Sequence, residues 1–355
     1  MKLSNFIIGL GSVLGLAIVS TYSQAEPDVL TRPAIVTAKA MNSVMLAVTR
    51  AGHRLIAVGE RGFVILSDDD GQHWRQATTP VSVSLTNVQF PTEKSGWAVG
   101  HGGIVLRSAN GGESWTKQLD GKQAAQIVLD SAKEANATAQ QLAEAERLVA
   151  DGADKPFLDV HFTDESNGMI VGAYGLILRT RDGGATWHSL MDRLANPKGK
   201  HLYQLNEKNG EILLAGEQGA LFVSGDGANS FREINTPYKG TYFGVISSGP
   251  GRWLAYGLRG NAYCTSDSGR SWQKVDTGAP VTVTAGMHLS DNSIVLADES
   301  GRLLQGHDCS TAFHTLPVPN PSPITALAEA SDGAIVLTGT RGISRYGIKP
   351  KSEPR

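Results

Sequence analysis

Short apolar runs recur in pairs along the chain, and the two runs of each pair are separated by a four-residue segment rich in glycine. The first pair covers residues 55–58 and 63–66, which are joined through Gly59 and Gly62. Apolar runs of this length, bounded by turn residues, are typical of buried β-strands. The pattern therefore predicts a series of β-hairpins.

The hairpin recurs seven times at nearly constant spacing. Successive copies are 41 residues apart, apart from steps of 72 and 44 residues on either side of the third copy. Glycine occupies the second marker position in every copy, as expected where a tight turn needs a positive φ. A fixed period of about 20 to 50 residues indicates a propeller or a solenoid. The marker positions are Gly59/Gly62, Gly100/Gly103, Gly172/Gly175, Gly216/Gly219, Gly257/Gly260, Asp298/Gly301 and Gly339/Gly342.

A second signature, Ser/Thr-x-Asp/Asn-x-Gly-x-x-Trp, follows most of the hairpins and is known as an Asp-box. We expect its carboxylate or amide to accept hydrogen bonds from nearby backbone N–H groups, and its aromatic residue to pack inside the repeat. The fourth copy has Ala228 in place of the glycine, and the sixth retains only Asp308 and Phe313. The predicted structural pairs are Asp69/Trp74, Asn110/Trp115, Asp182/Trp187, Asp226/Phe231 and Asp267/Trp272.

Each repeat predicts four strands, one before the hairpin, two within it and one that carries the aromatic residue. The fold class is therefore all-β, a seven-bladed propeller of four-stranded antiparallel blades. The chain ends before a fourth strand of blade seven, and we expect residues 34–38 to supply that strand and close the ring. Residues 121–155 interrupt the repeat between blades two and three, and their Ala-, Gln- and Glu-rich composition predicts a helical insertion.

The first 25 residues have the pattern of a secretory signal, with Lys2 followed by an apolar segment and a small-x-small site that ends at Ala25. We expect cleavage after Ala25, which leaves residues 26–355 as an exported, periplasmic propeller without a transmembrane segment. Cys264 and Cys309 could form a disulfide in that compartment. Their different depths in neighbouring repeats favour two free, buried thiols instead.

Charge and motifs restrict the possible functions. A formal net charge of -2 argues against a general nucleic-acid binder, which needs a basic surface. The nine histidines are scattered, and the sequence has no known metal, phosphate-loop or nucleophile motif in a suitable context. We therefore expect no catalytic residues, no metal and no cofactor. The densest acidic group, Asp68 to Asp70, coincides with an Asp-box turn, so we interpret Asp68 and Asp70 as solvated neighbours of Asp69.

Arginine immediately precedes the second hairpin glycine in three repeats, at Arg61, Arg259 and Arg341. Because the strands of a blade alternate in direction, these turns and the connections between blades should lie on one face, together with the helical insertion. Tyr174 and His101 occupy neighbouring turn positions on that face. The arginines could bind an acidic partner segment through charge-assisted hydrogen bonds. Solvated turn arginines are the alternative interpretation, and Glu60, Glu217 and Glu299 give the face a mixed charge.

The glycine hairpins, the Asp-boxes and the segment Gly96-Trp97-Ala98-Val99-Gly100 together resemble the photosystem II stability and assembly factor family. The resemblance extends over nearly the whole mature chain. It implies a non-enzymatic scaffold that binds a subunit of a membrane-protein complex through an arginine-bearing face, of which Arg61, Arg259 and Arg341 are candidate members. We expect a monomer with a protein partner.

Asp-boxes also occur in sialidases and other glycoside hydrolases, so a hydrolase that uses the central cavity is an alternative function. Seven units instead of six, and the absence of a Phe/Tyr-Arg-Ile-Pro motif ahead of the repeats, count against it. A propeller that binds glycans without hydrolysing them is a further alternative.

Overall fold

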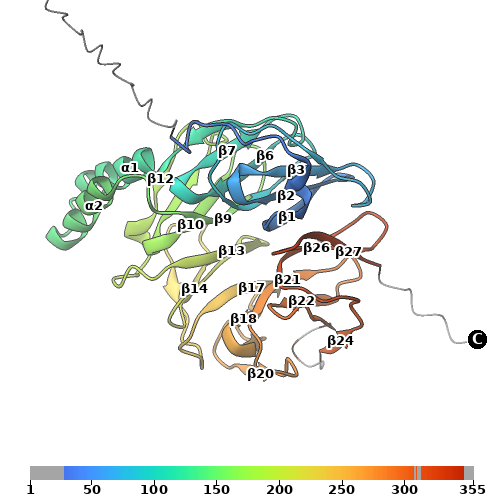
Figure 1. Cartoon of the computed structure of the whole chain (residues 1–355). Coiled ribbons are helices and arrows are strands. Elements are labelled where there is room, and N and C mark those ends of the chain that lie inside the picture. The colour runs from blue at the N-terminus through green and yellow to red at the C-terminus, as the bar shows by residue number, and fades with distance from the viewer. Residues whose placement is uncertain (1–27, 308, 310–312, 348–355) are drawn as a thin grey trace, which may run out of the picture.

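The computed structural model describes residues 28–307, 309 and 313–347. The predicted secretory signal and Asp308 lie outside these residues. The strands form seven antiparallel sheets in sequence order. Figure 1 shows these sheets following one another around a ring, so that the last blade stands beside the first. The predicted propeller is confirmed, although blade seven has three strands instead of four within the described residues.

The strands of each blade are consecutive in the chain. Blade one contains β1 (Met45–Ala51), β2 (Arg54–Gly59), β3 (Val64–Ser67) and β4 (Arg75–Gln76). Blade two contains β5 (Leu85–Gln89), β6 (Gly96–Gly100), β7 (Val105–Ser108) and β8 (Thr116–Leu119). Blade three contains β9 (Phe157–Phe162), β10 (Gly168–Gly172), β11 (Ile177–Thr180) and β12 (His188–Ser189). Blade four contains β13 (Leu202–Lys208), β14 (Glu211–Gly216), β15 (Leu221–Ser224) and β16 (Arg232–Glu233).

The remaining blades follow the same plan. Blade five contains β17 (Tyr242–Gly249), β18 (Arg252–Gly257), β19 (Ala262–Thr265) and β20 (Gln273–Val275). Blade six contains β21 (Val283–His288), β22 (Ile294–Asp298), β23 (Leu303–Gly306) and β24 (His314–Leu316). Blade seven contains β25 (Ile324–Glu329), β26 (Ile335–Gly339) and β27 (Gly342–Tyr346).

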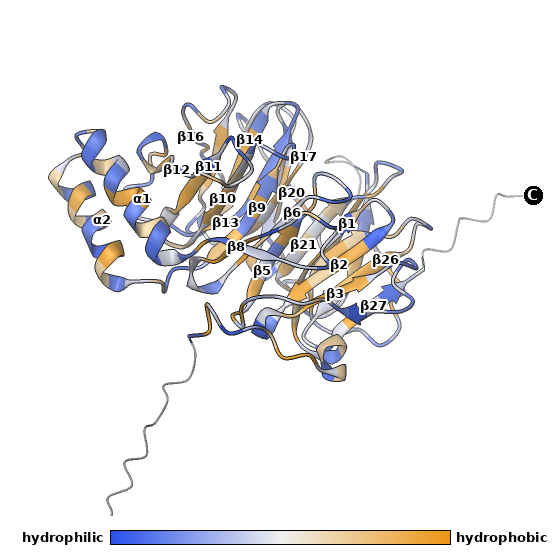
Figure 2. Ribbon diagram, turned by 90° about the horizontal axis from the view of Figure 1, so that it is seen from above, coloured by the Kyte–Doolittle hydropathy of each residue, from blue (hydrophilic) through white to orange (hydrophobic). Residues whose placement is uncertain are grey.

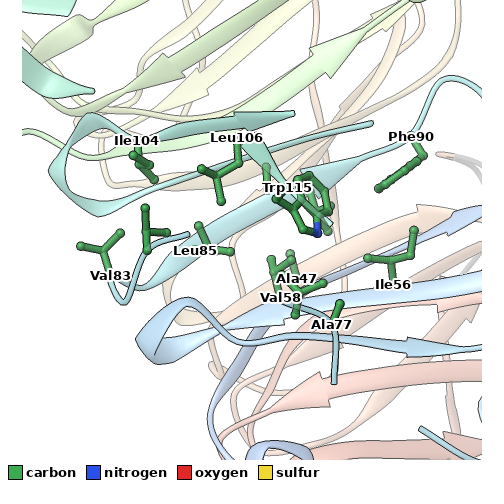
Figure 3. Close-up of a cluster of buried hydrophobic side chains, with 14 of the residues drawn as sticks. Ala47, Ile56, Val58, Ala77, Val83, Leu85, Phe90, Ile104, Leu106 and Trp115 are labelled. Carbon is green, nitrogen blue, oxygen red and sulfur yellow. The ribbon is translucent and has the colours of Figure 1, made fainter. Parts of the chain in front are cut away.

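The hydrophobic core lies between the blades. Figure 3 shows Ile56 and Val58 of blade one facing Leu85 and Trp115 of blade two, and all four side chains are buried. In the view from above, apolar residues concentrate in middle strands such as β2 and β10 (Figure 2). Each blade therefore buries its apolar surface against the next blade, as a propeller requires.

The Asp-box aromatic residues pack against their own blade, as expected, and also reach the preceding one. The ring centroids of Trp115 and Phe90 are 5.7 Å apart in blade two, and those of Trp187 and Phe162 are 6.2 Å apart in blade three. A single sheet has no interior, so an apolar ring is buried only where two blades meet. Phe231 of blade four is buried in the apolar cluster that contains Met169 and Leu190 of blade three. Trp115 and Trp187 are buried in the corresponding clusters, between blades one and two and between blades two and three. These rings therefore join each blade to the one before it.

Trp74 and Trp272 are only partly buried. Trp74 packs against the cluster between blades seven and one, and its indole N–H donates to the Gly71 carbonyl (3.1 Å). Trp272 packs against the cluster between blades four and five, where its ring centroid lies 6.5 Å from that of Trp253. Both tryptophans thus cover the outer end of a contact between blades, where solvent still reaches part of the ring.

The second hairpin glycine of each blade is required for two reasons. Gly62 has φ of 73°, and a Cβ atom there would lie 2.2 Å from the carbonyl oxygen of Val81, in the connection to blade two. In blade seven, Gly342 has φ of 89°, and a Cβ atom there would lie 2.3 Å from the carbonyl oxygen of Met41. The N-terminal segment thus occupies the place that a connection between blades has elsewhere in the ring.

The prediction that residues 34–38 complete blade seven is wrong. The segment passes beside blade one, where Ala34 N–H donates to the Thr79 carbonyl (3.2 Å) and Thr37 N–H donates to Gln76 Oε1 (2.9 Å). It then forms the 3-10 helix η1 (Ala38–Asn42), which contacts β27. These backbone groups are bonded to blade one before the chain reaches the edge of β27, so they cannot form a strand there.

Side-chain contacts between blades seven and one close the ring instead. Thr325 Oγ1 donates to the Met45 carbonyl (2.7 Å), Ser331 N–H donates to Asp70 Oδ1 (2.8 Å), and Arg345 Nε donates to the Asp70 carbonyl (2.9 Å). Asp70, which we expected to be a solvated neighbour, therefore joins the two blades. Ala40 is fully buried in the apolar cluster between these blades.

The predicted helical insertion is present between β8 and β9. It consists of α1 (Gly121–Glu134) and α2 (Ala139–Asp151), and each helix begins with a capping box, at Asp120 and Thr138. The apolar sides of both helices pack in one cluster with Leu119 and Trp187, so the pair lies against the outer part of blades two and three. Within the described part of the chain, no helix is long and apolar enough to cross a membrane.

The two cysteines form a disulfide, so the expectation of free thiols is wrong. Cys264 lies on β19 of blade five, and the Cα atoms of Cys264 and Cys309 are 5.5 Å apart. Cys309 follows the end of β23 and belongs to a loop. A loop residue is not held at a fixed depth in its blade, so Cys309 can reach the neighbouring blade.

Polar side chains link the innermost strands of blades two to five. Asp159, which is buried on β9, accepts hydrogen bonds from Asn87 Nδ2 in blade two and from Leu205 N–H in blade four (2.7 Å). Gln204 Oε1 in turn accepts a hydrogen bond from Val245 N–H in blade five (2.6 Å). The inner-edge backbone N–H groups of Leu205 and Val245 thus find partners in the neighbouring blade.

Replacing Ala40 by aspartate tests the closure of the ring. A charge placed in this buried cluster should lower the free energy of unfolding by about 2 kcal/mol or more. Ala38 is exposed on the same 3-10 helix, so Ala38→Asp should change that free energy by less than about 0.5 kcal/mol. Urea denaturation followed by tryptophan fluorescence measures both. Equal effects of the two variants would show that η1 does not help to close the ring.

The inner polar chain predicts a pH dependence of stability. Burial raises the pKa of Asp159 to about 7, compared with about 3.9 for an unfolded aspartate. Between these values the folded protein binds one more proton than the unfolded chain, so the contribution of Asp159 to the free energy of unfolding decreases as the pH rises.

We therefore expect the free energy of unfolding of the native protein, measured relative to Asp159→Asn, to fall by about 2 kcal/mol between about pH 5 and pH 7. Burial lowers the pKa values of His161 and His288, and these groups have the opposite pH dependence. The comparison with Asp159→Asn cancels their effect, because both proteins contain them. Parallel pH profiles for the two proteins would contradict the role assigned to Asp159.

Candidate partner-binding face

One face of the ring carries the turns between the second and third strands of the blades, together with the connections between blades; we call it the turn face. Arg61, Tyr174 and Arg259 have φ values of 56°, 57° and 55° on this face. Gln218 has the same conformation in blade four, and Gly102 has it in blade two. The left-handed conformation costs a residue other than glycine roughly 1 kcal/mol or more. Four blades thus hold a larger side chain where glycine would be less strained.

Arg341 lies on the same face but in a shorter turn, because Gly339 pairs directly with Gly342. Arg61 and Arg341 belong to adjacent blades, whereas Arg259 is separated from Arg341 by blade six. Tyr174 and His101 belong to blades three and two. The structure therefore distributes the five predicted residues around the face instead of joining them in one cluster.

The three guanidinium groups are exposed, and none has a hydrogen-bonding or ion-pair partner among the residues that the structure describes. Among the described residues, the glutamates of the turn face form no ion pair with these arginines. Each glutamate accepts a hydrogen bond from the backbone N–H at the entrance to the innermost strand of its own blade. These bonds join Glu60 to Val44 (3.2 Å), Glu217 to His201 (2.8 Å) and Glu299 to Thr282 (3.2 Å).

A row of aromatic side chains, which sequence reasoning missed except for Tyr174, extends over blades three to five. The ring centroids of Tyr174 and His201 are 5.0 Å apart, those of His201 and Tyr203 are 6.4 Å apart, and those of Tyr203 and Phe243 are 5.3 Å apart. The ammonium group of Lys155 lies 4.9 Å from the centroid of the Tyr174 ring. We call Tyr174, His201, Tyr203 and Phe243 the aromatic row.

An open cavity of about 480 Å³ adjoins the turn of blade five. Arg259, Lys274, Asp276 and Pro280 are among the residues that line it. Two cations and one carboxylate therefore border this cavity, and it has room for an acidic group beside Arg259.

The Asp-boxes stabilise the turns on the opposite face. Asp182 Oδ1 accepts from Thr180 Oγ1 (2.8 Å) and from Thr186 N–H (2.8 Å), and Thr180 Oγ1 accepts from Gly184 N–H (2.8 Å). Asp226 and Asp267 accept equivalent hydrogen bonds. These hydrogen bonds lower the pKa values of all three carboxyl groups to about 2.

Two Asp-boxes form the same turn with a different residue. In blade two, the amide of Asn110 replaces the carboxylate, and its Oδ1 atom accepts from Ser114 N–H (3.1 Å). In blade four, Ala228 adopts φ of 62° in place of the glycine. The turn therefore depends on an acceptor oxygen and a left-handed backbone, and each of these can be supplied by more than one residue type.

The acidic residues of blade one also have partners within that blade or its neighbour. Asp69 closes its Asp-box turn through Ser67 and His73, while Asp68 forms ion pairs with Arg54 and Arg75. Across the described residues, no three histidine, cysteine, aspartate or glutamate side chains come together as a candidate metal site.

The fold and its turns define the chain as a seven-bladed Asp-box β-propeller. Residues 138–295 match the family described as photosynthesis system II assembly factor YCF48. The photosystem II assembly lipoprotein Ycf48 of Synechococcus sp. strain CC9902 is 31% identical over 140 residues, which cover 39% of this chain and 42% of that protein. The match thus spans less than half of the relative. The resemblance predicted from the sequence is confirmed.

Solved structures show the same fold. YCF48 bound to D1 peptide superposes with a TM-score of 0.66 at 18% identity, over 90% of this chain and 97% of that chain. YCF48 from Cyanidioschyzon merolae has a TM-score of 0.65 at 14% identity, over 86% of this chain and 96% of that chain. The GH74 xyloglucanase from Xanthomonas campestris has a TM-score of 0.60 at 13% identity, over 88% of this chain and 53% of that chain.

Replacing Arg259 by glycine tests whether this arginine serves the fold. Relief of the left-handed strain is offset by the greater backbone freedom of glycine in the unfolded chain, so the free energy of unfolding should change by less than about 1 kcal/mol. Ala57→Gly, in the interior of β2, should lower that free energy by about 1 kcal/mol or more because it also removes a buried methyl group. Urea denaturation measures both values. A loss above about 2 kcal/mol for Arg259→Gly would assign Arg259 to the fold.

Proposed function

We propose that this chain is a non-enzymatic, exported scaffold that binds an acidic segment of a membrane-protein complex on its turn face. The observation that carries this proposal is that Arg61 and Arg259 adopt a strained backbone conformation while their guanidinium groups remain exposed and unpaired. Strain that the fold does not need is characteristic of binding sites.

The energetics of arginine support an acidic partner. A guanidinium group forms strong, directed hydrogen bonds with a carboxylate, and it is more weakly hydrated than an ammonium group. The glutamates of the turn face are held by backbone N–H groups, which leaves the arginines available. Arg341, His101 and Tyr174 extend the same face to blades seven, two and three.

The relatives support the proposal without deciding the partner. A propeller of this fold, YCF48, has been solved bound to D1 peptide, and the Synechococcus relative is an assembly lipoprotein. We propose an equivalent role for this chain, with a subunit of an envelope complex as its client. The expected cleavage after Ala25 would place it in the periplasm.

A glycoside hydrolase is the second candidate, because the GH74 xyloglucanase has the same fold. Hydrolysis needs two carboxyl groups that flank the substrate. The carboxyl group of Asp159, on an innermost strand, is buried and bonded to Asn87, Val160 and Leu205. Turnover of a fluorogenic glycoside by the purified protein, abolished by one acid substitution, would favour the hydrolase.

In-cell cross-linking in the native host, followed by affinity purification and mass spectrometry, tests the scaffold proposal. The native protein should recover subunits of one membrane complex. The triple variant Arg61→Ala, Arg259→Ala and Arg341→Ala should reduce that recovery roughly ten-fold or more, because charge-assisted hydrogen bonds to the partner are lost.

A matched control removes the same charge elsewhere. Arg181 and Arg270 lie in Asp-box turns, Arg232 lies on β16, and all three are exposed. Replacing these three residues by alanine should leave recovery unchanged. Equal recovery by both triple variants would refute the assignment of the turn face.

A further inference from the structure

The aromatic row departs from the repeat at a defined position. Tyr203 and Phe243 lie where the innermost strands of blades four and five have an irregularity in their pairing. Blades two, six and seven have Thr86, Thr284 and Thr325 at the same position. Each threonine hydroxyl donates to a carbonyl of the next blade, at distances of 2.7 Å for Phe157, 2.6 Å for Ile324 and 2.7 Å for Met45.

Blades four and five therefore lack a hydrogen bond between blades that blades two, six and seven form, and blades one and three, which have Leu46 and Leu158 there, lack it as well. Such a bond stabilises the contact between two blades. Tyr203 and Phe243 remain half-buried, so their rings are not fully used by the core either. An aromatic residue in a place where the fold would gain from threonine indicates a role in binding.

The row is held rigidly at its outer end. Lys155 lies over one face of the Tyr174 ring, and His201 is held by Glu217 through its backbone N–H (2.8 Å) and its Nδ1 atom (3.0 Å). The Tyr174 side chain is nevertheless 50% exposed. Fixed, partly exposed rings lower the entropic cost of binding, and aromatic side chains dominate the energetics of many interfaces.

The geometry of the row favours a peptide over a glycan. Neighbouring rings are inclined to one another by 45°, 44° and 73°, so they do not form a flat platform for a chain of sugar rings. Inclined rings leave edges and faces against which another aromatic side chain can pack. Followed from ring to ring, the aromatic row is as long as about five residues of extended chain.

Arg259 lies at the blade-five end of the row. The N–H of Leu258, which precedes it, donates to the carbonyl of Thr241 (3.1 Å), two residues before Phe243. An acidic side chain near one end of a bound segment would therefore meet Arg259 and the adjoining cavity.

We propose that the aromatic row binds an extended peptide segment in which an aromatic side chain is followed or preceded, a few residues away, by an acidic one. The segment packs its aromatic side chain against Tyr203 and Phe243, and its carboxylate pairs with Arg259. This inference rests on the proposed function and specifies the chemistry of the partner segment.

The repeat itself supplies the test variant. Tyr203→Thr with Phe243→Thr restores the residue that three other blades carry, so this double variant should fold. Leu46→Thr changes the same position in blade one, outside the row, and serves as the matched control. Thermal unfolding of all three proteins should show that both variants are folded.

The probe is a random library of peptides of about twelve residues displayed on phage and selected on the immobilised native protein. Selected peptides should combine aromatic and acidic residues. In fluorescence anisotropy, their Kd should rise roughly ten-fold or more for the double variant, as expected when aromatic anchors are lost, and less than about two-fold for Leu46→Thr.

Each other outcome overturns the inference. If the selected peptides bind the double variant as tightly as the native protein, the aromatic row is not their binding site. If the triple arginine variant then binds these peptides more weakly than the native protein, the proposed function stands. If both variants bind the selected peptides as tightly as the native protein, both proposals fail. Failure to select any peptide would also count against the inference. Binding of a xyloglucan-oligosaccharide array, lost only in the double variant, would assign the row to a glycan.

Discussion

The packing of each blade against its neighbour is the interaction on which the rest of this structure depends. A single four-stranded blade has two apolar sides and cannot bury both of them alone, so the sheets are stable only as a closed ring. The clusters between blades one and two, and between seven and one, are the same kind of contact. The last contact differs in one respect, because it joins the two ends of the chain.

The ring closes without a shared sheet. Among the described residues blade seven has three strands, and the N-terminal segment takes the place of a connection between blades by placing the Met41 carbonyl beside Gly342. Ala40 fills the apolar cluster, while Asp70 and Thr325 provide polar links across the junction. Closure therefore rests on side chains and on Ala40, the one buried residue of η1, which makes it sensitive to single substitutions.

The same constraint organises the two faces. Asp-box turns are satisfied internally, since their carboxylates accept from their own backbone and hydroxyl groups. On the turn face the glutamates are also satisfied internally, whereas Arg61, Arg259 and Arg341 are not. The aromatic row lies on this second face, where Tyr203 and Phe243 replace a threonine that would strengthen the ring. The turn face thus combines exposed guanidinium groups with half-buried aromatic rings.

The sequence by itself determined the number of blades, the glycine turns, the Asp-boxes and the helical insertion. These features depend on backbone dihedrals and on short-range periodicity, so they are readable from residues close together in the chain. It also identified Arg61, Arg259, Arg341, Tyr174 and His101 as sharing a face, because strand direction alternates regularly.

Only the tertiary structure decided which distant residues meet. Asp70 and Ser331 are separated by 261 positions, and the pairing of Cys264 with Cys309 depends on the freedom of a loop, which no repeat pattern records. The Asp-box motif contains an aromatic residue, but only the arrangement of the blades in a ring places Trp74, Phe231 and Trp272 between two blades. Tyr203 and Phe243 look like ordinary apolar residues of two strands until the ring brings them beside His201 and Tyr174. Contacts of this kind are set by the closure of the ring, because long-range packing and not local preference places them.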